Sequence, residues 1–518
     1  MNDRRFDVII IGSGFGAAPP ALRLAEAGLR VLVLEKGPEI VPSRDFRQTQ
    51  DPRYLLKWFR GVDGPHFGMT YIEGLGGGSG FYEMVTLRAP SQAFDQEVAG
   101  RRLWPSGIDR ASLDPWYDLA EGMMRVRQIR PEAVPASGRV FARLLADIGH
   151  SCERARYAEN GCVNSGFCVT GCVYNAKMGP LTTYIPAAKN AGAEYRCDAE
   201  VTAIERDASD GYRIDVRYHD RGETERLRTR LLLLGGGTVG TARLLLESRQ
   251  GLGLATQHVG RNIAWNGGTK AACLLAPDLP DGDMFVGRTH AGVICYDFLP
   301  SHGVTISPVK AMPLMAMAAL HLRRHRSDPF WGRTHVELMR QMRYRMLALY
   351  AMGLAPPAAR LVLGRSGRLT TQLQVTPELK AYFRSTRDLM NDLMTRRGCQ
   401  TLHVESVTRE GLPHEGLHCG TAHQVGSCRM SDRPEEGVCD AAGQVWGLPG
   451  LYITDGSAVP SSLAVNPCLT ITANSERITH GILEQLGVRP KPSEPGRDLN
   501  AGESPRPGQI PHVREADR

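Results

Sequence analysis

Three small residues and one acid near the N-terminus have the types and the spacing to bind a dinucleotide. Gly12, Gly14 and Ala17 follow the pattern G-x-G-x-x-A, and Glu35 stands 21 residues after Gly14. Gly12 permits a tight turn, Gly14 lets the backbone approach a pyrophosphate, and Ala17 allows close packing of helix on strand. A carboxylate at position 35 can accept hydrogen bonds from both hydroxyls of an adenosine ribose. The chemistry on offer is the binding of NAD or FAD, and this unit alone does not distinguish them.

A strand, a helix and a second strand are needed to position those residues. The β-branched run 6–11 is typical of a buried strand, an amphipathic helix follows to about Ala27, and residues 30–34 form a second apolar run. Pro19 and Pro20 fall in the first turn of that helix, where a missing N–H costs little. The helix N-terminus offers free amides and a partial positive charge to phosphates. The sequence therefore predicts a βαβ unit that binds a dinucleotide.

Two further glycine-rich stretches resemble parts of such a site. In residues 74–80, Gly76–Gly78 lack every Cβ that would keep backbone from a cofactor, and Ser79 adds a hydroxyl donor. Apolar residues on both sides favour a cofactor loop over a flexible linker. Residues 235–248 follow the apolar run 231–234 and again have the order strand, glycines, helix. A second phosphate site is one interpretation, and a close crossover beside the first βαβ unit is the one we prefer.

The C-terminal part supplies the remaining chemistry. Asp455-Gly456 comes just beyond an apolar strand, where ligands of open α/β sheets bind. Asn466 and Pro467 have the types of the N-cap and the first residue of a helix. Such a helix N-terminus, aimed at a flavin, would stabilise the negative charge that reduction brings.

A cysteine-rich loop at residues 160–179 invites a metal interpretation. Cys162, Ser165, Cys168 and Cys172 match the spacing of a ferredoxin cluster, with serine in place of the second cysteine. With three thiols and no proline after the last, packed cysteines in a glycine-rich loop are favoured over an iron–sulfur or zinc site. We expect no metal.

The composition is that of an ordinary globular protein of two or three domains. The 518 residues are 42% apolar, and the net charge of +7 is spread along the chain, which does not argue for nucleic acid. No stretch approaches the length of a transmembrane helix, and the apolar start is too short for a signal peptide. We therefore expect a cytoplasmic protein with reduced thiols.

Further elements are expected from the hydrophobic pattern and from residues typical of helix starts and turns. They are an irregular stretch at 38–73, a helix within 104–130 whose start is marked by Asp114-Pro115, a helix at 181–192, strands within 194–234, an antiparallel sheet with inserted helices at 270–420, and a disordered tail at 487–518.

The basic segment 321–350 has two interpretations. Val336, Met339, Met342, Met346 and Tyr350 recur at spacings of three and four, which indicates one helix with an apolar stripe. A basic, Met-rich helix is typical of a peripheral membrane contact. A helix that packs its stripe on the core, with solvated arginines, is the interpretation we favour.

Several stretches together resemble the glucose–methanol–choline (GMC) family of FAD oxidoreductases, and most closely its cholesterol-oxidase-like branch. They are GSGFGAAPPALRLAEAG with VLVLEKG, GLGGGSG, GCVNSGFCVTGCVYNAK, LGGGTVGTARLLL, TAHQVGSCRM and LYITDGSAVPSSLAVNPCLTITANSER, in the family's order. The chain departs from the family at Tyr82, where many relatives have asparagine, and at Ser165. No residue matches the additional glutamate base of cholesterol oxidases, so a sterol substrate does not follow.

The resemblance implies FAD as cofactor and assigns roles by position. His423 and Asn466 match the pair that faces the flavin N5, and they are the implied catalytic residues. A histidine suits removal of a hydroxyl proton because its ordinary pKa of ~6.5 makes it a usable base near neutral pH. The implied cofactor-binding residues are Gly12, Gly14, Phe15, Gly16, Glu35, Gly77, Gly78, Ser79, Val201, Asp455, Gly456, Asn466 and Pro467.

The expected fold is α/β with an α+β substrate part: a Rossmann-like FAD-binding domain and a second, largely antiparallel-sheet domain. The FAD-binding domain would comprise residues 1–90, 181–270 and 420–486, and the substrate domain 91–180 and 271–419.

The expected function is oxidation of the CH–OH group of a lipophilic or bulky small-molecule alcohol, with oxygen, a quinone or a protein as electron acceptor. The alternatives are a non-redox lyase on the same fold and a binding or electron-transfer subunit, against which the intact His423 and Asn466 argue.

Overall fold

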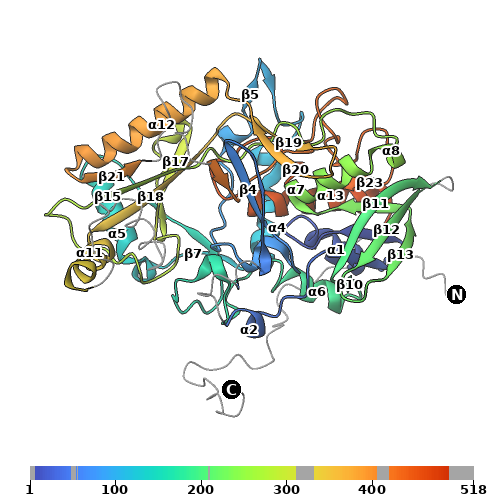
Figure 1. Ribbon diagram of the computed structural model, residues 1–518, viewed down its shortest axis with the longest axis horizontal. Coiled ribbons are helices and arrows are strands. Elements are labelled where there is room, and N and C mark those ends of the chain that lie inside the picture. The colour runs from blue at the N-terminus through green and yellow to red at the C-terminus, as the bar shows by residue number, and fades with distance from the viewer. Residues whose placement is uncertain are drawn as a thin grey trace, which may run out of the picture.

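The computed structural model of the chain describes residues 6–47, 54, 57–207, 211–310, 332–404 and 419–488 (Figure 1). Its helices are α1 Ala18–Glu26, α2 Pro42–Asp45, α4 Arg110–Met123, α5 Ala136–Ala146, α6 Tyr184–Asn190, α7 Gly237–Glu247, α8 Arg249–Leu252, α9 Leu299–His302, α11 Gly332–Tyr344, α12 Pro377–Arg396 and α13 Cys468–Gln485. Four larger sheets and several two-stranded ribbons complete the fold.

A parallel five-stranded sheet holds the first βαβ unit. Its order is β10-β2-β1-β14-β23, with β10 Glu194–Arg196, β2 Val31–Leu34, β1 Val8–Ile11, β14 Leu231–Leu234 and β23 Leu451–Ile453. Every residue of the last four is buried, as expected for strands covered on both faces. Helix α1 packs against α6 and α13 beside this sheet. The expected Rossmann-like α/β architecture is confirmed.

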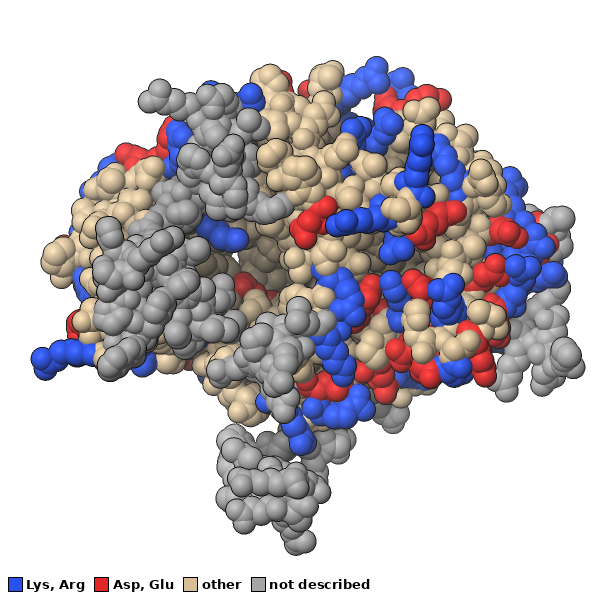
Figure 2. Space-filling model, in the orientation of Figure 1, with Lys and Arg blue, Asp and Glu red and all other residues tan. Residues whose placement is uncertain are grey.

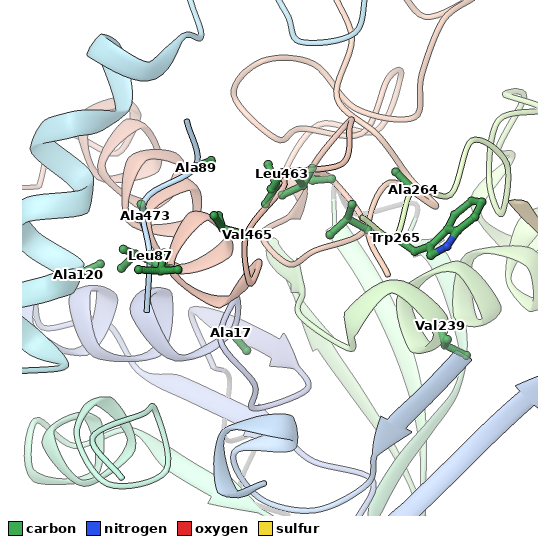
Figure 3. Close-up of a cluster of buried hydrophobic side chains, with 14 of the residues drawn as sticks. Ala17, Leu87, Ala89, Ala120, Val239, Ala264, Trp265, Leu463, Val465 and Ala473 are labelled. Atoms are coloured by element: carbon green, nitrogen blue, oxygen red, sulfur yellow. The ribbon is translucent and has the colours of Figure 1, made fainter. Parts of the chain in front are cut away.

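Glycines bring two crossovers of this sheet into backbone contact. Gly12 has a φ of +94°, and a Cβ on it would lie 2.4 Å from the carbonyl oxygen of Gly235. A Cβ on Gly235 would lie 2.5 Å from the Cβ of Ala17. The stretch 235–248 is thus the close crossover beside the first βαβ unit that we preferred. Figure 3 shows further small buried side chains: Ala17 stands at the N-cap of α1 and Ala473 lies in α13, and these two helices pack on each other.

An antiparallel four-stranded sheet forms the other large part of the molecule. Its order is β17-β18-β15-β21, with β17 Val304–Val309, β18 Met346–Gly353, β15 Thr269–Leu274 and β21 Gln400–Val404. Helix α12 packs on β15 and β21, and α5 on β17. In Figure 1 this sheet lies on the opposite side of the molecule from β10–β13. The expectation of an antiparallel sheet with inserted helices is confirmed.

The segment 38–73 is not irregular, and that expectation was wrong. It contains α2 and an antiparallel hairpin of β3 Phe59–Asp63 and β4 Phe67–Ile72, and β4 pairs in parallel with β22 Cys419–Thr421. Because the third strand of this sheet is distant in sequence, the local pattern did not reveal the hairpin.

The smaller strands form ribbons and one antiparallel sheet. They are β11 Ala199–Asp207, β12 Gly211–Tyr218 and β13 Thr224–Thr229 in one sheet, and the pairs β19 Ala359–Leu363 with β20 Leu369–Leu373, β5 Glu97–Val98 with β6 Arg101–Arg102, β7 Val126–Gln128 with β9 Arg156–Ala158, and β8 Glu153–Arg154 with β16 Val293–Ile294. The strands expected within 194–234 and the helix expected at 181–192 (α6) are confirmed.

The start predicted for the helix within 104–130 was wrong. Helix α4 begins at Arg110, capped by Asp109, whose side chain accepts a hydrogen bond from the Ser112 amide while the Ser112 hydroxyl accepts one from the Asp109 amide. This capping box decides the start, and Pro115 lies inside the helix. The Asp114 carboxylate instead binds Arg88 and Arg110.

The single helix expected over 321–350 was wrong in its second half. Residues 321–331 lie outside the described residues, α11 ends at Tyr344, and Met346 and Tyr350 belong to strand β18. Met342 packs with Met284 and Met346 in a small apolar cluster. Arg343 and Arg345 form ion pairs with Asp283 and Asp281. These contacts favour a helix that packs on its own chain over a membrane contact.

The division into two domains remains a prediction, although the five parallel strands all come from the three segments expected to build the FAD-binding part. The tail from residue 489 on lies outside the described residues. Within the described part of the chain, no helix combines the length and apolarity that crossing a membrane requires.

Candidate active site

The glycine turn after β1 leaves space and free donors where a pyrophosphate would bind. A Cβ on Gly14 or on Gly78 would meet no atom within 4 Å, and one on Gly77 would lie 3.4 Å from the Gly14 Cα. The amides of Gly14, Phe15 and Gly16 donate to no acceptor among the described residues. A bare backbone surface with unpaired amides at a helix start suits a phosphate group. The residues present therefore fit a dinucleotide.

Glu35 is tied to the second glycine loop through one hydroxyl. Ser13 Oγ donates to Glu35 Oε2 at 2.5 Å and accepts from the Gly76 amide at 2.9 Å, while the Gly37 amide donates to Glu35 Oε1 at 2.9 Å. Burial raises the pKa of Glu35 to about 7, against the lowering effect of the Ser13 and Gly37 hydrogen bonds. The carboxylate keeps lone pairs for two ribose hydroxyls. Ser13 was not predicted from the sequence, although it stands inside the G-x-G motif.

Ser79, a predicted cofactor-binding residue, closes its own loop. Its hydroxyl donates to the Gly76 carbonyl at 2.7 Å and accepts from the Leu181 amide at 3.2 Å. The loop continues as a single 3-10 turn, Gly77–Gly80. Ser79 thus shapes the backbone that faces Gly14.

Asp455 lies where β23, α7 and the first glycine turn meet. Its Oδ2 accepts from the Gly237 amide at 2.7 Å and from Thr241 Oγ1 at 2.5 Å, and its Oδ1 accepts from the Ser457 amide at 2.7 Å. Burial raises the pKa of this carboxyl, and these donors lower it. A Cβ on Gly16 would lie 2.3 Å from the Asp455 Cα. The carboxylate thus links two crossovers of the sheet, a role that the sequence did not suggest.

The positions of Val201 and Gly456 show little about a cofactor site. Val201 is partly buried in β11, where the pairing with β12 shifts register. Gly456 follows Asp455, and its carbonyl accepts from the Gly426 amide at 2.9 Å.

His423 and Asn466, 43 residues apart in sequence, face each other directly. Asn466 Nδ2 lies 3.2 Å from His423 Nε2. If the amide donates, Nε2 is the acceptor and the ring proton sits on Nδ1. His423 is half-buried, and the surrounding protein lowers its pKa to about 4, so the ring is neutral near pH 7. His423 Nδ1 and Asn466 Oδ1 are buried without a hydrogen-bond partner among the described residues. Two orphaned polar atoms at one contact indicate a place for a polar ligand.

Asn466 is not the N-cap of the last helix, and that prediction was wrong. Helix α13 begins at Cys468, and Pro467 occupies the N-cap position without a side-chain hydrogen bond. The Asn466 amide is turned to His423 instead of to the helix amides. Asn466 stands two residues after Ala464, which holds a left-handed φ of +55°, and this bend directs the chain toward His423.

Two sheets position His423. Strand β22, paired with β4, ends two residues before it, and the His423 amide donates to Thr421 Oγ1 at 2.9 Å. From the antiparallel sheet, the ring of Tyr350 lies 6.4 Å from the His423 ring, between centroids. Figure 2 shows the molecule hollowed near the centre of the view, between the side that carries the antiparallel sheet and the side that carries β4 in Figure 1. Sequence reasoning gave no signal for Tyr350, which it assigned to a helix.

The cysteine loop is organised around a buried lysine. Lys177 donates to the Gly80 carbonyl at 2.8 Å and to the Cys168 carbonyl, and burial lowers its pKa to about 8. Among the described residues, no three His, Cys, Asp or Glu side chains are grouped so as to hold a metal ion.

Comparisons with known proteins agree with this geometry. Residues 9–266 and 370–475 match the two sequence profiles that describe GMC oxidoreductases. A cholesterol oxidase of Mycobacterium tuberculosis is 28% identical, over 91% of this chain and 90% of the relative. A 2-methyl-1,2-propanediol dehydrogenase of Mycolicibacterium austroafricanum is 24% identical, over 91% and 94%.

A solved structure shares the fold across nearly the whole chain. Pyridoxine 4-oxidase from Mesorbium loti superposes with a TM-score of 0.67 at 14% identity, covering 93% of this chain and 99% of that one. The two profile matches together span more than half of the chain, and the relatives cover 91% of it. The chain belongs to the GMC oxidoreductase family, whose members bind FAD.

Proposed function

We propose that this FAD oxidoreductase oxidises the CH–OH group of a lipophilic or bulky alcohol, with His423 as the base and Asn466 as the residue that holds the alcohol oxygen. The observation that carries the proposal is the contact between His423 Nε2 and Asn466 Nδ2, with an orphaned polar atom on each residue. Bound FAD would supply the acceptor, at its N5, for the hydride of the substrate carbon. The names of relatives, a cholesterol oxidase and a diol dehydrogenase among them, support an alcohol substrate without selecting one.

The chemical role of His423 follows from its protonation. A neutral ring with its lone pair on Nε2 can take the hydroxyl proton as the C–H bond breaks. The amide of Asn466 can donate to the same oxygen without competing for that proton. A base held 3.2 Å from a fixed amide has the geometry that orients the oxygen.

The proposed cofactor contacts use the groups already described. The pyrophosphate would lie on the free amides of Gly14, Phe15 and Gly16, and the adenosine ribose on Glu35. The N-terminus of α13, entered through Asn466 and Pro467, would stabilise negative charge on the isoalloxazine. The proposed set is completed by Gly12, Gly77, Gly78, Ser79, Val201, Asp455 and Gly456.

An anaerobic screen of alcohols for bleaching of the flavin tests the proposal. His423→Ala should slow reduction by roughly 10²–10⁴-fold, the usual worth of a positioned general base. His480→Ala, an exposed histidine on α13, serves as control and should leave the rate unchanged. Equal rates in wild type and His423→Ala would place the base elsewhere.

A lyase on the same fold is the second candidate. It predicts that an alcohol is cleaved while the flavin stays oxidised. If an alcohol does reduce the flavin, mixing the reduced protein with oxygen or with a quinone identifies the class of electron acceptor.

A further inference from the structure

The antiparallel sheet presents one face to His423 and Asn466. Thr305 Oγ1 in β17 donates to the carbonyl of Ala464 at 2.6 Å, two residues before Asn466. Tyr350 in β18 contributes the ring near His423. Because side chains alternate along a strand, Thr305, Ser307 and Val309 share this face, while α5 packs on β17. We call this the site-facing side of the sheet.

Ser307 is an unexplained polar residue on that side. It is 1% exposed, and its hydroxyl has no hydrogen-bond partner among the described residues. It stands directly opposite Tyr350 across β17 and β18. The Tyr350 hydroxyl lies over Gly268, where a Cβ would be 2.1 Å away. A buried orphan hydroxyl is destabilising unless something binds it.

His290 is a second orphan on the same side. It bridges Val309 at the edge of β17, is 2% exposed, and has no described partner at Nε2. The Gly292 amide donates to His290 Nδ1 at 3.3 Å, and the Tyr157 hydroxyl lies 3.0 Å from the same nitrogen. With Nδ1 as the acceptor of the amide, the ring proton sits on Nε2. Burial lowers the pKa of His290 to about 4, which keeps the ring neutral. Its Nε2–H is therefore an unused donor.

The two orphans can serve one oxygen atom. His290 and Ser307 are diagonal neighbours across the strand pair, roughly 7–8 Å apart between Cα atoms. An oxygen between them can accept from His290 Nε2–H and exchange a hydrogen bond with Ser307 Oγ. Ser307 stands two residues along β17 from Thr305, or about 7 Å farther from Ala464.

We propose that Ser307 and His290 bind a second oxygen of the substrate, so that the enzyme prefers an alcohol that carries a further uncharged hydroxyl remote from the reacting carbon. This inference rests on the proposed function, because it takes His423 and Asn466 as the reacting end. A hydroxyl oxygen can accept from His290 Nε2–H and can either accept from or donate to Ser307 Oγ. A site built around hydrogen bonds rejects analogues that lack the partner group.

Matched alcohols test the inference. The probes are linear α,ω-diols of four to eight carbons with their primary mono-alcohols, and 1,4-cyclohexanediol with cyclohexanol. For each pair, flavin reduction gives a ratio of kcat/KM, and flavin difference spectra of the oxidised protein give a ratio of Kd. Wild type should favour the best diol by roughly 10–100-fold.

Variants decide whether the two residues cause that preference. Ser307→Ala and His290→Phe should each bring both ratios to within about threefold of one, and Ser307→Thr should retain the preference. Ser137→Ala is the control, because Ser137 in α5 is also a buried serine with an orphan hydroxyl. It should behave as wild type.

The outcomes separate the two proposals. Equal ratios for wild type, or a Ser307→Ala variant as selective as wild type, would overturn the inference while alcohol oxidation stands. If no alcohol reduces the flavin, the proposed function fails, and the Kd ratio still tests the second oxygen site. A loss of preference in both variants, with the control unchanged, supports the inference.

Discussion

The parallel and the antiparallel sheet contribute to the site in different ways. Around the parallel sheet, backbone meets backbone: Gly12 touches Gly235, Gly16 touches Asp455, and glycine surfaces are left bare. On the antiparallel sheet, the site-facing side offers side-chain atoms that no described residue uses. The cofactor side therefore depends on the absence of side chains, and the substrate side on their identity. Substitutions on the first should affect folding, and those on the second should mainly affect selectivity.

The largest effect is expected at Gly16. Valine there would place its Cβ 2.3 Å from the Asp455 Cα and 2.5 Å from the Thr454 carbonyl, so we expect no folded protein by near-UV circular dichroism. Gly14→Ala is the matched control, since its Cβ meets nothing within 4 Å. That variant should fold and yet bind FAD weakly. A folded Gly16→Val variant would contradict the view that close backbone contacts build the part of the molecule around the parallel sheet.

A buried ion pair should show the next largest effect. Arg23 in α1 binds both oxygens of Glu476 in α13 at 3.0 Å, and Tyr184 donates to the same carboxylate. Glu476→Ala leaves a buried guanidinium without this partner and should lower the free energy of unfolding by about 3–5 kcal/mol. Chemical denaturation measures it. As a control, Asp215→Ala breaks the exposed pair with Arg226 and should cost less than about 1 kcal/mol.

Thr305→Val tests the contact between the antiparallel sheet and the segment that leads from Ala464 to Asn466. The change orphans the Ala464 carbonyl and should lower the free energy of unfolding by about 1–3 kcal/mol. Because Ala464 precedes Asn466 by two residues, the variant should reduce its flavin more slowly than wild type, while its rate of FAD release should change less.

Ser307→Ala should leave the free energy of unfolding within about 0.5 kcal/mol of wild type, or raise it, because the change removes an orphan group. A large loss there would show that the hydroxyl is structural.

The smallest effect concerns Glu35 and pH. In the FAD-free protein its pKa is raised to about 7, and hydrogen bonds from ribose hydroxyls favour the charged carboxylate. FAD affinity should therefore be full above pH 7 and fall on acidification, by about tenfold between pH 8 and pH 6. Titration of the apoprotein with FAD measures this. Glu35→Gln should bind more weakly and show a flat profile, and a sloping profile in that variant would assign the pH dependence to another group.

Prediction from sequence succeeded where contacts are local and failed where partners are distant. The first βαβ unit, its glycines and the helix α1 needed only residues 6–36. The strand pair β3–β4 was missed because its third strand begins at Cys419. The start of α4 was misplaced because a proline is a weaker signal than a capping box. Tyr350 was placed on a helix because the apolar residues of 346–350 fit both the helical and the strand period over so short a run.

The sequence by itself indicated the family, the cofactor, the presence of a parallel and an antiparallel sheet, and His423 and Asn466 as the proposed catalytic residues, because these depend on short motifs whose spacing reflects backbone geometry. Only the tertiary structure decided which buried polar atoms lack partners and which strand faces the site. Ser307 and His290 belong to no sequence motif, and only the register between strands places them near each other. A one-residue shift of that register would turn both side chains away from His423.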